Sequence, residues 1–291
     1  MAIDRKKLLG HIFAFATIVI WSIAFVSNKA LLSYITPIEN MIFRFAIAYF
    51  ILLIIYPQYK MPNSLKDEIH FFILGFLGIF IYFILENFAL EYTQATNVGL
   101  YMGSIPLFTA IFAHFMTKDE ELSKNIIIGF IIAIIGIGLI LLEGSKFELR
   151  LKGDLLALGA AMIFSLYSVM LKLAPKGYNY ILITRKSFFY GLILMMIYQL
   201  IAGGSLPISK LLIPAVALNI AFLGILSSGL AFILWQQGIE RIGSIATSNY
   251  IYLVPLITAI AGILLLDEKI TMQMSIGGLL ILMGLYAAQR K

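Results

Sequence analysis

Long apolar segments separated by short polar breaks occupy almost the whole chain. A bilayer core is about 30 Å thick and a helix rises 1.5 Å per residue, so a run of roughly 20 apolar residues can cross it. On this criterion the sequence predicts ten transmembrane helices, at residues 8–32, 37–57, 69–90, 93–117, 125–143, 154–174, 179–202, 211–237, 243–266 and 271–289. The breaks carry proline, glycine and charged residues typical of turns, and none is long enough for a folded domain. The predicted fold class is therefore an all-α integral membrane protein.

The composition of the 291-residue chain excludes an ordinary soluble protein and several kinds of chemistry. Hydrophobic residues make up 61% of the chain and charged residues 12%, against about 25% charged residues in soluble domains. Cysteine is absent, which excludes disulfides, thiolate metal sites and cysteine nucleophiles. His11, His70 and His114 are too far apart in the sequence to form a metal-binding motif. We expect no catalytic residues, no metal and no cofactor.

The formal net charge of +6 predicts an orientation in the membrane rather than a nucleic-acid partner, because no basic face with interleaved aromatics is present. The apolar run after Arg5-Lys6-Lys7 is too long for a signal peptide and lacks an Ala-x-Ala exit, so it is a retained first helix. With the N-terminus inside, the inner loops carry Arg5, Lys6, Lys7, Lys60, Lys66, Lys118, Lys124, Lys176, Arg241, Arg290 and Lys291, and the outer loops carry Lys146, Arg150, Lys152, Lys210 and Lys269. The positive-inside rule then predicts that both termini are cytoplasmic, with the cell membrane as the host bilayer.

The second half of the chain repeats the first. At an offset of 149 residues the matched pairs are Glu91/Glu240, Tyr101/Tyr250, Pro106/Pro255, Leu107/Leu256, Thr109/Thr258, Asp119/Glu268 and Gly129/Gly278. At an offset of 143 they are Ser22/Ser165 and Lys29/Lys172, with Trp21 opposite Phe164, and Arg44 meets Arg185 after a two-residue deletion. We therefore predict two five-helix repeats, at residues 1–147 and 148–291. Because five is odd, the second repeat enters the membrane from the opposite face, so the repeats are inverted.

An inverted repeat has a mechanistic consequence. One sequence pattern supplies two nearly equivalent packings, and exchanging them between the halves turns an outward-open cavity into an inward-open one. This symmetry favours a secondary transporter. An intramembrane enzyme is disfavoured because no nucleophile elbow or phosphate-binding loop appears. A scaffold or sensor is disfavoured because the short loops offer nothing to bind a soluble partner.

Several of these residues resemble a known family. Trp21, Lys29, Pro37 and Arg44-Phe45 resemble the start of an EamA-type repeat of the drug/metabolite transporter superfamily. Its end is similar to the stretch from Gly103 through Pro106 to Glu120, Gly129 and Gly136, and to that from Leu253-Val254-Pro255 through Glu268 to Gly278 and Gly284. The resemblance implies a ten-helix exporter or exchanger of small metabolites, similar to bacterial amino-acid exporters. The second copy departs from the first where Phe164 replaces tryptophan and where Lys186-Ser187 follows Arg185.

Four ionisable side chains in the predicted spans are candidate substrate contacts, since each one costs a few kcal/mol to insert. Arg44 lies roughly 10 Å into its helix and either pairs with helix-end carbonyls or Glu39, or meets a substrate carboxylate. Lys29 and Lys172 either extend to the headgroups or have a gating or substrate role. Glu86 is either solvated or paired, or it exchanges a proton that couples transport to a gradient.

Polar and aromatic residues at helical spacing predict the wall of a central cavity. Asn97, Tyr101 and Ser104 share one helix face, as do Trp21 and Asn28 with their neighbours. Such stripes also pack helices together without lining anything. Aromatic walls with few full charges suit a substrate with an apolar side chain. The proposed wall residues are Trp21, Asn28, Tyr82, Asn97, Tyr101, Tyr167, Trp235, Gln236 and Tyr250.

Two prolines and two apolar helices complete the prediction. Pro106 and Pro255 fall near the middle of their helices, where each removes a backbone hydrogen bond and creates a candidate hinge. The fifth and tenth helices should be peripheral and face lipid or a second subunit, so monomer and homodimer both remain open. The predicted partners are thus a small-molecule substrate and the lipid bilayer. Amino acids are the expected substrates, with nucleotide sugars, organic cations, vitamins and lipids as alternatives.

Overall fold

The computed structural model describes residues 4–31, 33–58, 60–142, 149–266 and 271–290. Within these ranges the chain is built from helices and contains no strand. The first half holds α1 (Arg5–Leu31), α2 (Pro37–Ile55), α3 (Leu65–Gly75), η1 (Phe76–Ile81), α4 (Tyr82–Tyr92), α5 (Ala95–Met102), α6 (Ile105–Met116) and α7 (Lys124–Leu141). The second half holds α8 (Leu151–Lys172), α9 (Tyr180–Ile201), η2 (Ile208–Leu212), α10 (Pro214–Phe222), η3 (Leu223–Leu230), α11 (Ala231–Ile242), α12 (Ser244–Ser248), η4 (Asn249–Tyr252), α13 (Leu253–Leu266) and α14 (Met272–Gln289).

The predicted membrane-spanning segments are confirmed closely. In the part of the chain that the structure describes, nine helical stretches are long and apolar enough to cross a membrane. The predicted span 243–266 corresponds to α12, η4 and α13, which follow one another as short pieces of helix. The third and eighth spans are also composite, because α3, η1 and α4 form one rod and α10, η3 and α11 form another.

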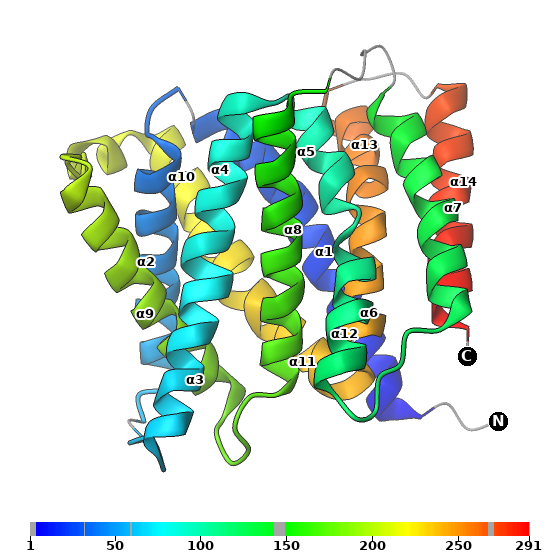
Figure 1. Ribbon diagram of the computed structural model, residues 1–291. Helices are drawn as coiled ribbons and strands as arrows, with labels where there is room; N and C mark the ends of the chain where they lie inside the picture. The colour runs from blue at the N-terminus through cyan, green and yellow to red at the C-terminus, as the bar shows by residue number, and fades with distance from the viewer. Residues whose placement is uncertain (1–3, 32, 59, 143–148, 267–270, 291) are drawn as a thin grey trace.

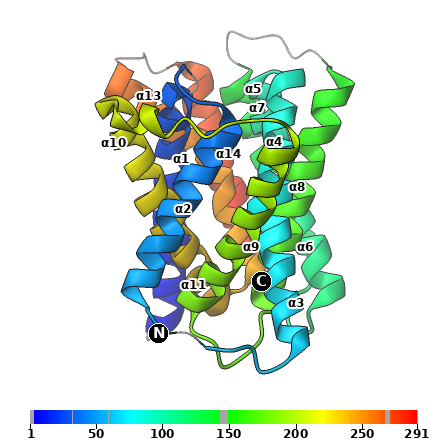
Figure 2. The same ribbon diagram turned by 90° about the vertical axis from the view of Figure 1, so that its left-hand side faces the viewer.

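The two halves run in opposite directions. In Figure 1, α1 begins at the lower end of the bundle, whereas α8, the first helix of the second half, begins at the upper end. The start of α1 and the end of α14 therefore lie at one end, which we call the terminal end. Figure 2 shows the same upright packing from the side, with α2 and α9 among the helices nearest the viewer. This arrangement is the inverted repeat that the sequence predicts.

The helix starts are determined locally. Thr36 caps α2, since its Oγ1 accepts the Glu39 N–H at 3.3 Å while Glu39 Oε2 accepts the Thr36 N–H at 2.8 Å. Pro37 occupies the first turn, where its missing N–H costs nothing. At the starts of α3 and α7, the side chains of Ser64 and Ser123 accept the N–H groups of Asp67 and Ile126, without the reciprocal bond seen at Thr36. Because Glu39 is used in this capping box, it is not the partner of Arg44.

Two π-helical turns interrupt the composite rods at equivalent places. Shifting η1 (76–81) by the repeat offset of 149 residues places it at 225–230, inside η3 (223–230). A π-helical turn inserts one residue and leaves backbone groups outside the regular hydrogen-bond ladder, which is common at functional sites. The hydrophobicity pattern does not reveal these turns, because the segments FLGIFI and LGILSSGL consist of apolar and small residues and show no clear polar face whose shift would mark the inserted residue.

Pro106 and Pro255 lie at helix starts rather than within continuous helices. Pro106 is in the first turn of α6, after a turn at Gly103 and Ser104 that ends α5. Pro255 is the third residue of α13, which follows the 3₁₀-helix η4. Both spans are therefore discontinuous at the predicted prolines, because proline cannot donate the hydrogen bond that would extend the preceding helix.

The fifth and tenth spans, α7 and α14, pack against each other at one side of the bundle (Figure 1). Their contact uses glycines, since a Cβ on Gly136 would lie 2.6 Å from Gly277 O, and one on Gly129 would lie 2.6 Å from Gly284 O. The outward faces expose isoleucine and leucine, including Ile128, which is 50% exposed. A close glycine seam with an apolar outer face is typical of membrane helices.

Candidate functional site

Arg44 lies inside the bundle and connects the two halves of the chain. It is 5% exposed, its Nε donates to Ser228 Oγ at 2.8 Å, and its Nη2 donates to Ser227 Oγ at 3.0 Å. The rings of Phe45 and Phe83 lie 5.3 and 5.4 Å from its Cζ. Hydroxyl acceptors and aromatic faces thus replace part of the water that the guanidinium loses. No ion pair to Arg44 occurs within the described ranges, and its net positive charge is not cancelled by a direct contact.

The π-helix η3 presents the acceptors for this arginine. Ser227 and Ser228 are both in η3, and Trp21 of α1 donates its Nε1–H to Ser227 O at 3.1 Å. Thr17, one turn earlier in α1, donates to Ala231 O at 3.3 Å. Irregular backbone is tolerated at membrane depth only where other groups satisfy it. The first half of the chain supplies those groups to the second.

Trp21 also belongs to an aromatic cluster formed by both halves. Its rings lie 5.7 Å from Phe164 and 5.1 Å from Trp235. Trp21 and Phe164 are equivalent positions in the two repeats, so their contact places the cluster near the axis that relates the halves. Trp235 is fully buried, and its Nε1 donates to Ser168 Oγ at 3.3 Å. Trp21 is half-buried, so part of its side chain stays accessible whereas Trp235 is enclosed by its neighbours.

Tyr82 and Glu86 of α4 form the acidic part of the same region. The Tyr82 hydroxyl donates to Glu86 Oε1 at 3.1 Å, and the Tyr82 ring lies 5.0 Å from Phe164. Glu86 is half-buried, and the ion pairs given for the described residues do not join it to Arg44. A cation, a carboxylate and an aromatic cluster therefore lie in one region of the bundle.

Arg185, the repeat equivalent of Arg44, has a different environment. Its guanidinium donates from Nη1 to Tyr56 O and from Nη2 to Gln58 O, the latter at 2.8 Å. Tyr56 follows the last residue of α2, so Arg185 neutralises free carbonyls at a helix C-terminus. The binding of helix-end carbonyls considered for Arg44 is thus observed at Arg185, while Arg44 binds side-chain hydroxyls inside the bundle.

Asn97 is part of a polar network that the sequence analysis did not identify. Asn97 Nδ2 donates to Asp154 Oδ1 at 3.1 Å, and Thr93 Oγ1 donates to the same oxygen at 2.8 Å. Asp154 Oδ2 accepts the Arg150 N–H at 2.8 Å. Asp154 is 3% exposed, so Glu86 is not the only buried carboxylate. The sequence pattern places Asp154 at the start of a predicted helix, where a carboxylate is usually solvated. In the structure its hydrogen bonds to Thr93, Asn97 and the Arg150 N–H give it a structural role that joins α5 to α8.

The other predicted wall residues are distributed over the bundle. Tyr101 is half-buried and packs beside Ala157 and Val98. Tyr250 shares a 3.0 Å hydrogen bond between its hydroxyl and His11 Nδ1. The repeat-matched tyrosines Tyr101 and Tyr250 therefore have different neighbours.

Three further candidates are held by specific contacts. Asn28 Oδ1 accepts from Asn40 Nδ2 at 2.9 Å, and Gln236 Oε1 accepts from Thr184 Oγ1 at 2.9 Å. Tyr167 is 2% exposed, and a Cβ on Gly78 of η1 would meet its ring at 2.4 Å. The side chain of Lys29 lies outside the described part of the structure.

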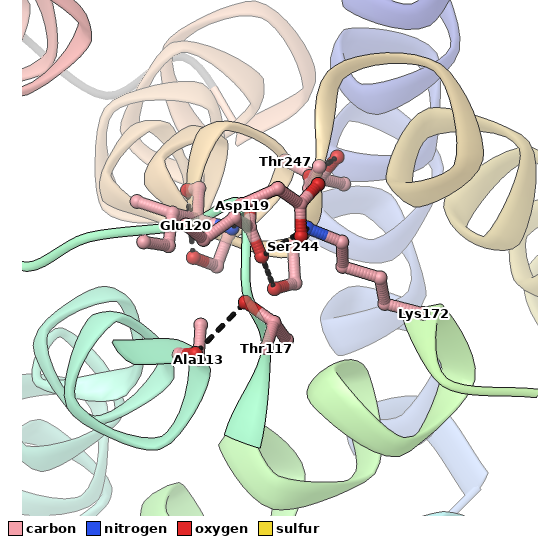
Figure 3. Close-up of polar contacts among 10 residues, drawn as sticks. Ala113, Thr117, Asp119, Glu120, Lys172, Ser244 and Thr247 are labelled. Carbon is pink, nitrogen blue, oxygen red and sulfur yellow. Dashed lines mark hydrogen bonds and ion pairs between the residues drawn. The ribbon is translucent and has the colours of Figure 1, made fainter. Parts of the chain in front are cut away.

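Lys172 forms ion pairs at the terminal end. Its Nζ lies 2.7 Å from Asp119 Oδ1 and 3.1 Å from Glu120 Oε2. Figure 3 shows these side chains converging with Ser244 from the start of α12. The hydrogen bond from Lys172 holds the pKa of Asp119 below its ordinary value of 3.8, so Asp119 stays ionised at neutral pH. Lys172 is thus held by two carboxylates rather than extending freely to the lipid headgroups.

Metal binding has no support in the described ranges, where no group of three or more histidine or acidic side chains could hold an ion. The region around Arg44 and Glu86 instead combines charged side chains and aromatic rings, in a bundle with two interrupted helices. These are means of binding and moving a solute.

Comparison with known proteins defines the class. The sequence profile of the EamA-like transporter family matches twice, at residues 8–142 and 151–288. The chain is 29% identical over 267 residues to the Bacillus subtilis "Uncharacterized transporter YyaM", covering 89% of this chain and 87% of that protein. It is 25% identical over 286 residues to an "Uncharacterized transporter" of Archaeoglobus fulgidus, covering 97% of both. A crystal structure with 19% identity superposes with a TM-score of 0.80 over 97% of each chain, which shows a shared fold.

This chain belongs to the EamA-like transporter family. It is a multi-pass membrane transporter with the two-repeat fold of that family, as the resemblance in the sequence implied.

Proposed function

We propose that the protein is a secondary transporter that exports or exchanges small metabolites, most specifically amino acids or related compounds, by alternating access. The observation that carries this proposal is Arg44, a cation buried inside the helical bundle whose bonds go to hydroxyls of the other half of the chain. A buried charge of this kind is costly and marks a substrate or ion pathway in membrane proteins.

The surroundings of Arg44 favour a substrate with one carboxylate and an apolar side chain. Arg44 would meet the carboxylate, and the half-buried Glu86 is available for an ammonium group or an exchanged proton. Trp21, Tyr82 and Phe83 offer aromatic surface for the side chain. Nucleoside diphosphate sugars carry two phosphate charges, which a single neighbouring arginine matches poorly. An organic cation would use Glu86 and be repelled by Arg44.

Counterflow in proteoliposomes tests the substrate class. Vesicles preloaded with unlabelled solute are assayed against labelled amino acids, vitamins, organic cations and nucleotide sugars, with and without a proton gradient. Accumulation of amino acids with apolar side chains is expected, with competition by other monocarboxylates. If no solute accumulates and labelled lipid is scrambled instead, the protein is a flippase and the proposal is wrong.

Alternating access assigns roles to the two repeats and their breaks. We assign the repeats to residues 1–147 and 148–291, and the hinges to Pro106 and Pro255, where α6 and α13 begin after an interruption. Bending there needs few backbone hydrogen bonds to break, because proline has already removed one. The same packing supports action as a monomer or as a homodimer through the α7 and α14 face.

The proposed location is the cell membrane with both termini in the cytoplasm. Single-cysteine labelling tests it cleanly because the chain has no cysteine. Ser64 lies at the start of α3 at the terminal end, and Ser205 lies in the exposed loop after α9 at the opposite end. A membrane-impermeant maleimide added to intact cells should label Ser205→Cys and spare Ser64→Cys. The reverse pattern would place the termini outside, and labelling of both from one side would contradict the topology.

A further inference from the structure

Glu120 joins three separate segments at the terminal end. It belongs to the connection between α6 and α7, and its Oε1 accepts the Ile245 N–H at 3.0 Å while its Oε2 accepts the Ser244 hydroxyl. The same Oε2 lies 3.1 Å from Lys172 Nζ, at the end of α8. Glu120 comes from the first half of the chain, and its partners come from the second (Figure 3).

The joint between α11 and α12 is shaped to receive this carboxylate. Gly243 has a φ of 90°, which favours glycine, and a Cβ there would lie 2.2 Å from Glu120 Oε1. The side chains of Glu120 and Lys172 are 10% and 15% exposed, whereas that of Asp119 is 72% exposed. Water screens an exposed pair, so the contact of Lys172 with Glu120 contributes more than its contact with Asp119.

A second ion pair at the same end also joins an acidic residue of the first half to a basic residue of the second. Lys186 Nζ of α9 lies 2.6 Å from Glu68 Oε2 of α3, and the Tyr190 hydroxyl also donates to Glu68. These three contacts, of Lys172 with Asp119 and Glu120 and of Lys186 with Glu68, each join the two halves at the terminal end.

We propose that the cluster of Asp119, Glu120, Lys172 and Ser244 is a latch that closes the terminal end of the transport pathway and opens once in each cycle. The inference rests on the proposed alternating access, in which the two halves must move relative to each other. A contact between segments that separate when the terminal end opens has to break, and its strength then sets the population of the closed state. The structure shows these contacts formed, and in this proposal it is the state in which the terminal end is closed.

Accessibility of a buried serine tests the latch without any substrate. Ser168 is fully buried one helical turn before Lys172, and Ser168→Cys supplies a nearly isosteric thiol in a chain without cysteine. Lys172→Met should raise its reaction rate with an impermeant maleimide, added at the terminal end, on the order of tenfold, the shift that a coupling of about 1.4 kcal/mol produces. Glu120→Gln should act in the same direction, since its amide oxygen can still accept the Ile245 N–H and its NH2 can donate to Ser244 Oγ, while the charge is lost.

The matched control is Lys176→Met, which removes the same charge at the same end from an exposed side chain. It should leave the labelling rate unchanged. If Lys172→Met leaves the thiol as unreactive as before in folded, monodisperse protein, or if Lys176→Met raises the rate equally, the latch does not exist.

A reversible bridge distinguishes a latch from a permanent structural contact. Glu120→Cys combined with Ser244→Cys, joined by a short bis-methanethiosulfonate, should stop counterflow, and a reductant should restore it. Continued counterflow with the bridge in place would overturn the proposal. Should no solute support counterflow, the transport proposal fails, while the labelling experiment still decides whether the terminal end opens.

Discussion

Arg44→Ala is expected to reduce the transport rate roughly 30-fold, which corresponds to about 2 kcal/mol. The guanidinium makes two hydrogen bonds to hydroxyls of η3 and provides the positive charge that the proposed carboxylate would meet. Arg44→Lys keeps the charge but not the planar fork, so it should raise KM for a carboxylate substrate more than it lowers the maximal rate. Initial rates in proteoliposomes at several substrate concentrations measure both effects.

Arg185→Ala is the matched control, because Arg185 is the repeat equivalent of Arg44. Its bonds go to Tyr56 O and Gln58 O at the end of α2. Its loss should lower the apparent Tm while transport per folded molecule falls much less than in Arg44→Ala. Equal loss of transport in both variants would show that Arg44 is structural.

Gly136→Ala is expected to destabilise the protein by about 1–3 kcal/mol through overpacking. A Cβ at Gly136 would lie 2.6 Å from Gly277 O and 2.9 Å from Ile281 N. These are backbone atoms of α14, so a side-chain rotation cannot relieve the clash and the two helices must separate. Thermal unfolding in detergent, followed by loss of monodispersity, measures the effect.

Gly138→Ala, two residues away on the same helix, should have the opposite sign. A Cβ at Gly138 meets nothing within 4 Å, so alanine only favours the helix, by about 0.5–1 kcal/mol. Similar changes in Tm for the two variants would contradict the tight α7 and α14 seam.

The two matched arginines show which structural features the sequence repeat predicts and which it does not. The alignment of Arg44 with Arg185 correctly indicates equivalent helices in inverted halves, but it does not predict their partners. Repeat 2 has Ser227 and Ser228 in its π-helix, whereas the offset of 149 places Gly78 and Ile79 at those positions in repeat 1. Without hydroxyls there, Arg185 has no equivalent contact in η1 and binds helix-end carbonyls.

The charged residues show a second limit. Sequence position identified Glu86 as the carboxylate inside a span and left Asp154 at a helix boundary, yet Asp154 is buried by Thr93 and Asn97. The sequence favoured extension of Lys172 to the headgroups and kept a gating or substrate role as the alternative. Its partners Asp119 and Glu120 are more than 50 residues away in the chain, as the 53-residue separation from Asp119 shows.

The sequence by itself determined the membrane-spanning segments, the duplication, its inversion and the breaks at Pro106 and Pro255. The reason is that lipid requires every backbone group to be satisfied within a helix, so apolar length and proline positions translate directly into structure. Only the tertiary structure decided that Arg44 meets η3, that Trp235 packs against Trp21, and that Glu120 joins Lys172 to the start of α12. These contacts join residues of the two halves, and their geometry depends on how the helices pack rather than on any local pattern.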